Sequence, residues 1–288
     1  MPELPEVETV RRGLQPVLEG ARLSRVEQRR PDLRFAFPEG FVQRLTGATI
    51  TALERRAKYL LARLDRGDTL VMHLGMTGRF EIDEPGGPRQ RPGDFVHAPA
   101  SDPKHAHVLF MTEAGATVTY SDPRRFGFMG LVETARLDQH PWFSAMGPEP
   151  LGPDFDAAVL VAAFKGRKQT AKTLLLDQRV VAGLGNIYVC EALHRSAISP
   201  IKPASEISKA KIKTLTAAIK DVLAEAIEAG GSTLRDYAGA DGALGYFQHT
   251  FRAYGQEGEP CPTPTCQGVI ERTVQAGRST FFCPVCQV

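Results

Sequence analysis

The stretch CPTPTCQGVIERTVQAGRSTFFCPVC, residues 261–286, contains four of the five cysteines of the chain. Cys261 and Cys266 are separated by four residues, Cys283 and Cys286 are separated by two, and 16 residues lie between the pairs. Two such pairs on a β-hairpin can surround a tetrahedral Zn²⁺ ion, and four thiolates leave no open coordination position. We therefore predict one structural zinc ion bound by Cys261, Cys266, Cys283 and Cys286.

The alternative for these cysteines is a pair of disulfide bonds. Disulfides are typical of oxidising compartments, whereas an odd number of cysteines gathered at one end favours a metal site in a reducing cytosol. Arg278 lies just before the second pair, where the hairpin would present it. The fifth cysteine, Cys190, lies in the apolar segment IYVCEALH, so we expect it to be packed and inert.

The composition is typical of a soluble globular protein with one large or two ordinary domains. The chain has 288 residues, of which 42% are hydrophobic and 24% are charged. We find no basic flank followed by an apolar run at the start and no apolar run near ~18 residues, which argues against a signal peptide and a membrane span. The net charge of +2 neither requires nor excludes a polyanionic partner, although basic residues cluster locally.

The order of the sequence patterns indicates two kinds of structure. Residues 2–20 predict a helix, in which Pro5 suits a first helical position and Val7, Val10 and Leu14 share one face. Short apolar or alternating runs then predict the strands of a sandwich or barrel, and they occupy residues 48–64, 69–82, 105–113 and 116–122.

The second half of the chain has a helical period. The Pro- and Gly-rich segment 146–155 predicts a linker. Residues 205–231 predict a helix that Ser205 caps and Gly230 closes, with an apolar stripe of Ile212, Leu215, Ile219, Leu223 and Ile227. The motif GLGNIY, residues 183–188, lacks the third glycine of a dinucleotide fingerprint. We interpret it as a tight turn between helices that can offer backbone N–H groups and the Asn186 amide to a phosphate.

The opening PELPEVE contains a candidate nucleophile. If Met1 is removed, Pro2 carries a free secondary amine. An α-amino group titrates near ~7.7–8.0, so part of it is unprotonated at neutral pH and can attack an electrophilic carbon. Glu3 stands beside it and could transfer protons. On these residues alone, ordinary helix capping explains the stretch equally well.

His105 and His107 alternate in KHAHVLF, which predicts that both lie on one face of a strand. We find no third ligand nearby and therefore disfavour a metal site there.

Several motifs occur in the order seen in one family. The sequence resembles the bacterial formamidopyrimidine-DNA glycosylases along essentially its whole length, in MPELPEVETVRRGL (1–14), RRAKYLL (55–61), MHLGMTG (72–78), YSDPRRFG (120–127), VAGLGNIYVCEAL (181–193), GGSTLRDY (230–237) and the cysteine-rich end. One departure is the first cysteine pair, because the family usually has two residues there and this chain has four.

The resemblance implies an α+β fold with an N-terminal β-sandwich and flanking helices, a helical H2TH domain and a zinc β-ribbon. We expect a catalytic domain over residues 1–140, a linker over 141–153, an H2TH domain over 154–254 and a zinc ribbon over 255–288. The implied activity is that of a bifunctional DNA glycosylase and AP lyase, which flips oxidised purines such as 8-oxoguanine out of duplex DNA. It forms an imine through Pro2 and cuts the strand by β,δ-elimination.

The resemblance also implies the roles of individual residues. The implied catalytic residues are Pro2, Glu3, Lys58 and Arg278. Glu6 is implied to belong to the substrate pocket. The implied DNA contacts are His105, Arg124, Arg167 and Asn186. The residues implied to fill the gap left by the flipped nucleotide are Met76, Arg124 and Phe126. We expect the lesion to be recognised by residues 236–248.

Two alternatives remain open at this point. The chain could be an endonuclease VIII-like enzyme acting on oxidised pyrimidines, although Leu4 and the complete DPRRFG block favour the purine branch. It could also be a catalytically silent DNA-binding protein. For the purine-lesion glycosylase we expect double-stranded DNA with oxidised bases or abasic sites as the partner, no membrane, and a monomer in the bacterial cytoplasm, associated with the nucleoid.

Overall fold

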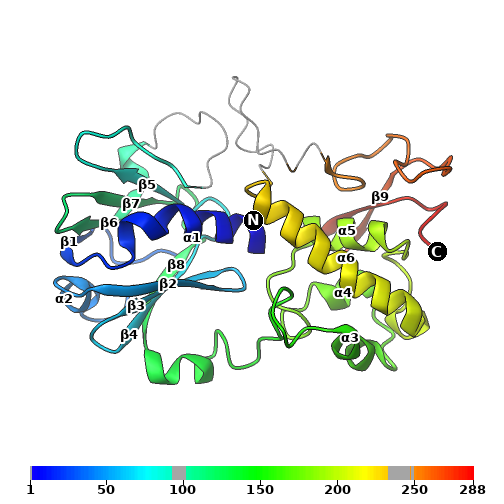
Figure 1. The fold of residues 1–288 in the computed structure, drawn as a ribbon, viewed down its shortest axis with the longest axis horizontal. Coiled ribbons are helices and arrows are strands. Elements are labelled where there is room, and N and C mark those ends of the chain that lie inside the picture. The colour runs from blue at the N-terminus through cyan, green and yellow to red at the C-terminus, as the bar shows by residue number, and fades with distance from the viewer. Residues whose placement is uncertain (1, 93–101, 233–246, 248–249) are drawn as a thin grey trace. The chain divides into compact units, whose positions relative to one another are not determined.

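The computed structural model describes residues 2–92, 102–232, 247 and 250–288. The chain divides into two compact units (Figure 1). The first consists of Met1–Ser144 and Gly230–Gly245, and the second of Ala145–Ala229 and Tyr246–Val288. The segment 236–248, which we predicted to recognise a lesion, lies outside the described residues except for Phe247.

Helix α1, Leu4–Leu18, begins the first unit. Glu3 is its N-cap, and Pro5 is the second helical residue, where a missing N–H costs no hydrogen bond. Val7, Val10 and Leu14 are buried, as the period of the sequence predicted. This face packs against the hydrophobic core of the unit, so the apolar stripe fixes the direction of the helix.

Eight strands of the first unit form two antiparallel sheets. One sheet has the order β1-β6-β7-β5 and the other has the order β2-β3-β4-β8. The strands are β1 Leu23–Gln28, β2 Ile50–Arg56, β3 Tyr59–Leu64, β4 Asp68–His73, β5 Arg79–Asp83, β6 Ala106–Thr112, β7 Thr117–Ser121 and β8 Phe128–Glu133. The strands β1 and β8 lie outside the four runs that we predicted.

The two sheets share one hydrophobic core. It combines Phe80, Phe110 and Val118 from the first sheet with Leu60 and Met72 from the second. Figure 1 draws the two sheets as separate layers with α1 beside them. The predicted β-sandwich is therefore confirmed. A short helix, α2 Phe41–Leu45, and two 3₁₀ turns, η1 Pro103–His105 and η2 Thr134–Gln139, complete this unit.

The second unit is helical and ends in a β-hairpin. Its elements are α3 Ala157–Phe164, α4 Ala171–Leu175, α5 Asn186–Arg195, η3 Ala204–Glu206, α6 Lys209–Glu228, β9 Glu271–Gln275 and β10 Arg278–Phe282. Helix α6 packs against α3 and α5. The stripe predicted for it is buried, namely Ile212, Leu215, Ile219, Leu223 and Ile227.

One predicted cap is wrong. The N-cap of α6 is Ser208, whose side chain accepts a hydrogen bond from the Lys211 N–H at 3.3 Å. Ser205 lies instead in η3. Both serines precede the apolar stripe, and the intervening 3₁₀ turn delays the start of the helix by one turn. The other end is as predicted, because Gly230 follows the last residues of α6 with a φ of +81°.

The hairpin that carries Arg278 turns through Ala276 and Gly277. Their φ angles are +48° and +72°, and two consecutive positive values are typical of a two-residue turn of type I′. Gln275 and Arg278 pair across the turn. Arg278 is exposed and is the first residue of β10.

Among the residues that the structure describes, no helix combines the length and the apolar character needed to cross a membrane.

Partly buried ion pairs join α1 to the β2–β3 hairpin. The Glu8 carboxylate accepts hydrogen bonds from Arg11 at 2.9 Å and from Arg55 at 3.1 Å, and all three side chains are at most 18% exposed. The Arg55 guanidinium also donates to the Ala57 carbonyl at 3.0 Å. Burial opposes ionisation of Glu8, but the arginines outweigh it and lower the pKa of Glu8 below its ordinary 4.5. The β2–β3 turn is therefore tied to the first turns of α1.

We predict that Glu8→Gln lowers the free energy of unfolding by about 1–3 kcal/mol at pH 7, because it removes the negative charge and one of the two acceptor oxygens that the arginines share. The folded-state pKa of Glu8 is lowered, so the stabilisation is complete above 4.5 and is lost as the pH falls below it. Urea denaturation of both proteins between pH 3 and pH 7 measures the difference. Glu54→Gln, which removes the more exposed pair with Arg63, should change stability far less. A difference that stays constant down to pH 3 would contradict the assignment.

Candidate functional site

The N-terminal residues are held by a reciprocal pair of hydrogen bonds. The side chain of Glu3 accepts from the backbone N–H of Glu6, and the Glu3 N–H donates to Glu6 Oε2 at 2.8 Å. This capping box satisfies two N–H groups that the start of a helix otherwise leaves without partners. Glu3 is 3% exposed. Pro2, directly before it, is partly exposed. The candidate nucleophile is therefore attached to a rigid helix start and remains accessible.

Glu6 uses its other carboxylate oxygen on a distant segment. Glu6 Oε1 accepts from the backbone N–H and from the hydroxyl of Ser232, both at 2.8 Å. The preceding Gly231 has a φ of +88°, and a Cβ there would lie 3.2 Å from Glu6 Oε1. Glu6 therefore joins the start of α1 to the segment that follows α6.

Lys58 is buried in the turn between β2 and β3. It is 6% exposed, and the preceding Ala57 has a φ of +52°. The Arg55 side chain holds this turn, since it contacts both Glu8 and the Ala57 carbonyl. Helix α1 packs against β2 and β3. These contacts anchor the Lys58 segment to the helix that begins beside Pro2.

His73 joins this group, and sequence reasoning missed it. It pairs with Tyr59 across β3 and β4. Burial, with the charges of Lys58 and Arg34, lowers the pKa of His73 to about 4, so the ring is neutral at neutral pH. Nδ1 accepts from the Gly75 N–H at 3.0 Å, which assigns the ring proton to Nε2. The result is a neutral N–H donor near a lysine. In the sequence, His73 could have been noticed only as a member of the motif MHLGMTG.

Two loops of the first unit meet backbone to backbone. One contains Gly75, Met76 and Thr77, and the other contains Arg124 and Phe126. A Cβ on Gly75 would lie 2.3 Å from the Phe126 carbonyl carbon, and Gly75 has a φ of +63°. Only glycine permits this approach without strain. The three predicted wedge residues, Met76, Arg124 and Phe126, therefore come from loops in direct contact.

Buried Asp122 holds both loops. It is 0% exposed, and its carboxylate accepts hydrogen bonds from the Thr77 hydroxyl and from the Gly127 N–H, the latter at 2.8 Å. The Arg124 N–H donates to the Thr77 hydroxyl at 3.2 Å, which extends the network across the loop contact. The Tyr120 hydroxyl adds a longer bond to Asp122 at 3.4 Å. One carboxylate thus fixes the backbone of both wedge loops.

The wedge side chains themselves are accessible. Phe126 is 44% exposed, Arg124 is exposed and Met76 is partly exposed. The Arg124 guanidinium lies over the Phe126 ring, 4.7 Å from its centroid. An exposed aromatic ring beside a cation suits contact with stacked bases rather than with a protein core.

The predicted alternation of His105 and His107 on one strand face is wrong. His105 ends η1, and β6 begins after it at Ala106. His107 is 3% exposed, and its Nε2 lies 2.9 Å from the Asp122 carbonyl oxygen. The backbone of His105 supports the same residue, since its carbonyl accepts from the Asp122 N–H at 3.0 Å. The His105 side chain is partly exposed.

In the second unit, the ammonium group of Lys172 and the side-chain amide of Asn186 converge on one carbonyl group beside Arg278. The Ser279 carbonyl accepts from Asn186 Nδ2 and from Lys172 Nζ, each at 2.8 Å. Lys172 is 0% exposed and also donates to the Thr280 hydroxyl at 2.6 Å. Asn186 is the first residue of α5, as the predicted interhelical turn requires. Arg167 is exposed in the loop after α3.

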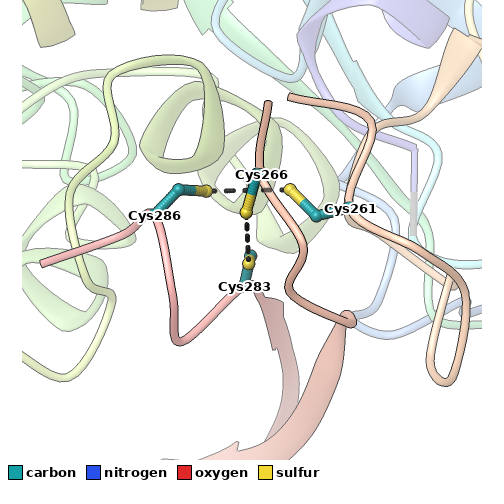
Figure 2. A group of neighbouring side chains, drawn as sticks. All are labelled: Cys261, Cys266, Cys283 and Cys286. Carbon is teal, nitrogen blue, oxygen red and sulfur yellow. Dashed lines mark hydrogen bonds between the residues drawn. The ribbon is translucent and has the colours of Figure 1, made fainter. Parts of the chain in front are cut away.

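The four ribbon cysteines form a cluster suited to zinc. Their sulfur atoms all lie within 4.8 Å of one another. Figure 2 shows them pointing toward a common centre, and the pairs Cys261–Cys286 and Cys266–Cys283 each lie 3.7 Å apart. A disulfide needs about 2.05 Å. Four thiolates around a tetrahedral Zn²⁺, with Zn–S of about 2.3 Å, lie about 3.8 Å apart. The spacing therefore fits zinc and excludes the disulfide alternative.

The pKa values of the cysteine thiols also favour a bound cation over four thiolates alone. Burial, together with the neighbouring Cys261 and Cys283, raises the pKa of Cys286 to about 12, whereas burial of Cys261 is outweighed by hydrogen bonds from Thr263, which lower the pKa of Cys261 to about 7. Several adjacent thiolates are unfavourable unless a positive ion compensates their charge. The cluster has four protein donors, so a bound ion has a closed shell and a structural role. The longer first pair does not prevent this arrangement, because Cys266 reaches the same centre as the other three.

The structure thus groups the predicted residues by unit. One group lies at the start of α1 or is tied to this helix, and it consists of Pro2, Glu3, Glu6 and Lys58. A second group lies on the two loops that Asp122 supports, and it consists of Met76, Arg124 and Phe126. In the second unit, Asn186 and the residue after Arg278 are directly bonded. Arg167 makes no such contact with them among the described side chains.

Three family models match consecutive parts of the chain. They are the formamidopyrimidine-DNA glycosylase N-terminal domain over residues 1–129, the formamidopyrimidine-DNA glycosylase H2TH domain over residues 146–238 and a zinc finger found in FPG and IleRS over residues 258–288. The formamidopyrimidine-DNA glycosylase of Caulobacter vibrioides is 74% identical over 288 residues, which cover 100% of both chains. That of Jannaschia is 58% identical over 287 residues, again with 100% coverage of both.

Solved structures agree with these matches. The formamidopyrimidine-DNA glycosylase of Lactococcus lactis, bound non-covalently to DNA with an AP site, superimposes with a TM-score of 0.83 at 33% identity and 99% coverage of each chain. A Lactococcus lactis mutant with DNA containing Fapy-dG gives 0.84 at 35% identity, with 99% coverage of both. The MutM (FPG) protein of Thermus thermophilus gives 0.81 at 40% identity, covering 99% of this chain and 98% of that one.

We predict that Asp122→Asn destabilises the first unit by about 1–3 kcal/mol, because the amide presents N–H groups to donors that now meet a carboxylate. Thermal denaturation followed by circular dichroism measures this loss. Asp138→Asn is the matched control, since Asp138 is exposed. Equal melting temperatures for Asp122→Asn and wild type would show that the carboxylate does not hold the loops.

Proposed function

We propose a reaction mechanism for this chain on the premise that it belongs to the formamidopyrimidine-DNA glycosylase family. The chain is a DNA glycosylase for oxidised purines, 8-oxoguanine and formamidopyrimidines among them, and it has the AP lyase activity of the family. Full-length identity to proteins named for formamidopyrimidine release favours this substrate class over oxidised pyrimidines. The steps below assign that activity to residues.

The first step is extrusion of the damaged nucleotide. A sugar carbon inside a duplex is out of reach of a protein nucleophile, so the nucleotide must leave the stack. Unstacking costs a few kcal/mol, and apolar side chains inserted into the gap recover part of it. We assign this insertion to Met76 and Phe126, with Arg124 bonding the base that has lost its partner. Their exposure and their fixed loops support the assignment.

The second step is covalent. After removal of Met1, the Pro2 nitrogen attacks C1′, and the glycosidic bond breaks with its electron pair on the departing base. The Pro2 nitrogen then gives up its N–H proton, which leaves its lone pair free. Opening of the sugar ring then gives an iminium between Pro2 and C1′, and the electrons of the C1′–O4′ bond take a proton on O4′. We assign that proton to Glu3. The observation that carries the assignment is a buried Glu3 carboxyl in the helix cap directly beside Pro2.

Elimination completes the reaction. A proton leaves C2′ of the iminium and the 3′ phosphate departs with the C–O electron pair, which is β-elimination. A second elimination releases the 5′ phosphate. We assign the first of these steps to Lys58 and the second to Arg278, which also binds a phosphate. Glu6 belongs to the pocket through its bonds to Ser232.

The remaining assignments concern the DNA backbone. Phosphate contacts position a duplex without reading its sequence, which suits an enzyme that searches for damage. We assign such contacts to His105, Arg167 and Asn186, and we add His73 because its Nε2–H is a neutral donor near Lys58. The zinc ion, bound by Cys261, Cys266, Cys283 and Cys286, supplies structure to the hairpin that bears Arg278. We further propose that the enzyme acts as a monomer in the bacterial cytoplasm, on the nucleoid.

We predict that borohydride traps the wild-type protein on duplex DNA that contains 8-oxoguanine or an abasic site, because hydride reduces the iminium to a stable amine. Glu3→Gln should give a cross-link only with DNA that is already abasic, since base release needs the acid. Denaturing electrophoresis of labelled DNA measures both products.

Two outcomes would contradict this mechanism. One is normal release of 8-oxoguanine by Glu3→Gln, which removes Glu3 from the reaction. The other is cleavage by protein that mass spectrometry shows to retain Met1, because the Pro2 nitrogen would then be an amide. The abasic substrate separates a loss of the helix cap from a loss of the acid, because a displaced Pro2 would fail to cross-link abasic DNA as well.

We also predict that Arg167→Gln reduces the salt dependence of DNA binding. Each neutralised phosphate contributes about 0.9 to the slope of log K against log salt, so the slope should become shallower by about 1. Fluorescence anisotropy between 50 and 200 mM KCl measures it, with abasic-analogue DNA. Arg136→Gln is the control, because Arg136 is exposed and pairs with Glu133. An unchanged slope for Arg167→Gln would remove Arg167 from the phosphate contacts.

A further inference from the structure

A histidine that the reaction does not use lies against the cysteine cluster. His194 is the second-to-last residue of α5 and is 3% exposed. Its Nε2 lies 3.4 Å from the Sγ of Cys261, which is itself 7% exposed. A contact between a buried ring nitrogen and a buried sulfur excludes water, so the histidine depends on the sulfur for its hydrogen bond.

The chemistry of a zinc-bound thiolate fixes the direction of this contact. A thiolate has no proton and can only accept, so the ring must present Nε2–H to it. Nδ1 of the same ring is buried and finds no hydrogen-bond partner among the described residues. The ring is therefore held by one polar contact, and that contact is to a metal ligand.

His194 lies outside the ligand set. The group of donor atoms within 4.8 Å of one another, searched over the described part of the chain, comprises the four cysteine sulfurs and leaves the histidine out. The 3.4 Å from Nε2 to Cys261 Sγ is the distance of an N–H···S hydrogen bond, and Gly268 makes a similar bond from its backbone to Cys266, also at 3.4 Å.

We propose that His194 is a positioning residue of the zinc site, which donates a hydrogen bond from Nε2 to the Cys261 thiolate and so strengthens zinc binding. Donation to a thiolate disperses its negative charge and fixes its orientation, and loss of such a partner commonly costs about 10- to 100-fold in metal affinity. The bond also ties Cys261, which begins the longer first cysteine pair, to a helix.

Neighbouring contacts also connect α5 and the residues just after it to the C-terminal segment that contains the four ribbon cysteines. Within the same unit, the Glu191 carboxylate accepts from the backbone N–H groups of Arg252, Ala253 and Tyr254 at 2.8–2.9 Å. Gln287 donates to the Ile198 carbonyl at 2.8 Å and accepts from the Cys283 N–H at 2.7 Å. His194 adds the contact that reaches a metal ligand directly.

Zinc release from the purified full-length protein tests the proposal. With 4-(2-pyridylazo)resorcinol as the competing chelator, His194→Phe should release zinc about 10-fold faster than wild type, because the ring is kept and the N–H is lost. His194→Gln should restore slow release, since its Nε2–H can reach the same sulfur. His107→Phe is the control, because His107 is another histidine that is 3% exposed and lies in the first unit. It should release zinc at the wild-type rate.

A spectroscopic signature separates this role from mere packing. In the cobalt-substituted protein, loss of the hydrogen bond makes the Cys261 thiolate more electron-rich, so His194→Phe should move the sulfur-to-cobalt charge-transfer band to longer wavelength. The d–d bands should keep the pattern of four sulfur ligands. Unchanged release and an unchanged charge-transfer band in folded His194→Phe would overturn the proposal. A change of the d–d bands from a sulfur–nitrogen pattern to an all-sulfur pattern would also overturn it, by making His194 a ligand. Neither measurement depends on glycosylase activity.

Discussion

The hydrogen bonds between Glu3 and Glu6 are the constraint on which the reaction site depends. A nucleophile at the end of a chain is normally its most mobile residue, and fixing one residue costs about 1–2 kcal/mol of conformational entropy. Here the helix cap offsets that cost, because the residues after Pro2 already form the first turn of α1. The same helix holds the Lys58 turn through Glu8 and Arg55. Rigidity needed for structure therefore also supplies the placement that the proposed attack of Pro2 on a sugar carbon requires.

A common design links the two units: side chains assigned to DNA are accessible, and the groups that hold them are buried. Phe126 is 44% exposed, whereas Asp122, which holds its loop, is 0% exposed. Arg278 is exposed, whereas Lys172, which bonds the next residue's carbonyl group, is 0% exposed. Burial of a polar group costs free energy unless hydrogen bonds within the protein replace those to water. Each of these buried groups has several such partners. The interface can thus meet a charged partner without reorganising its supports.

Local patterns predicted the local structure well. The apolar stripes of α1 and α6, the convergence of the two cysteine pairs and the hairpin between them follow from spacing alone. Ser208 rather than Ser205 caps α6, because two candidate caps stand three residues apart and propensity does not distinguish them. The strand order β1-β6-β7-β5, the burial of His73 and the loops joined by Asp122 could not be predicted, since they depend on contacts between residues far apart in sequence. The roles of Pro2 and Glu3 came from the family resemblance, as ordinary capping explained the same residues.

Helix α5 is bonded to the cysteine hairpin at both of its ends, through Asn186 to Ser279 and through His194 to Cys261. A domain boundary placed in the sequence between the helices and the cysteine hairpin would separate these bonded partners. The cysteine hairpin is therefore a poor unit for recombination: a chimera that exchanges residues 255–288 alone keeps these bonds only where the carbonyl of its residue 279 and its first cysteine reach Asn186 and His194. A chimera between two relatives should therefore exchange α5 together with the hairpin. Among relatives, substitutions at position 194 should occur together with substitutions in the first cysteine pair.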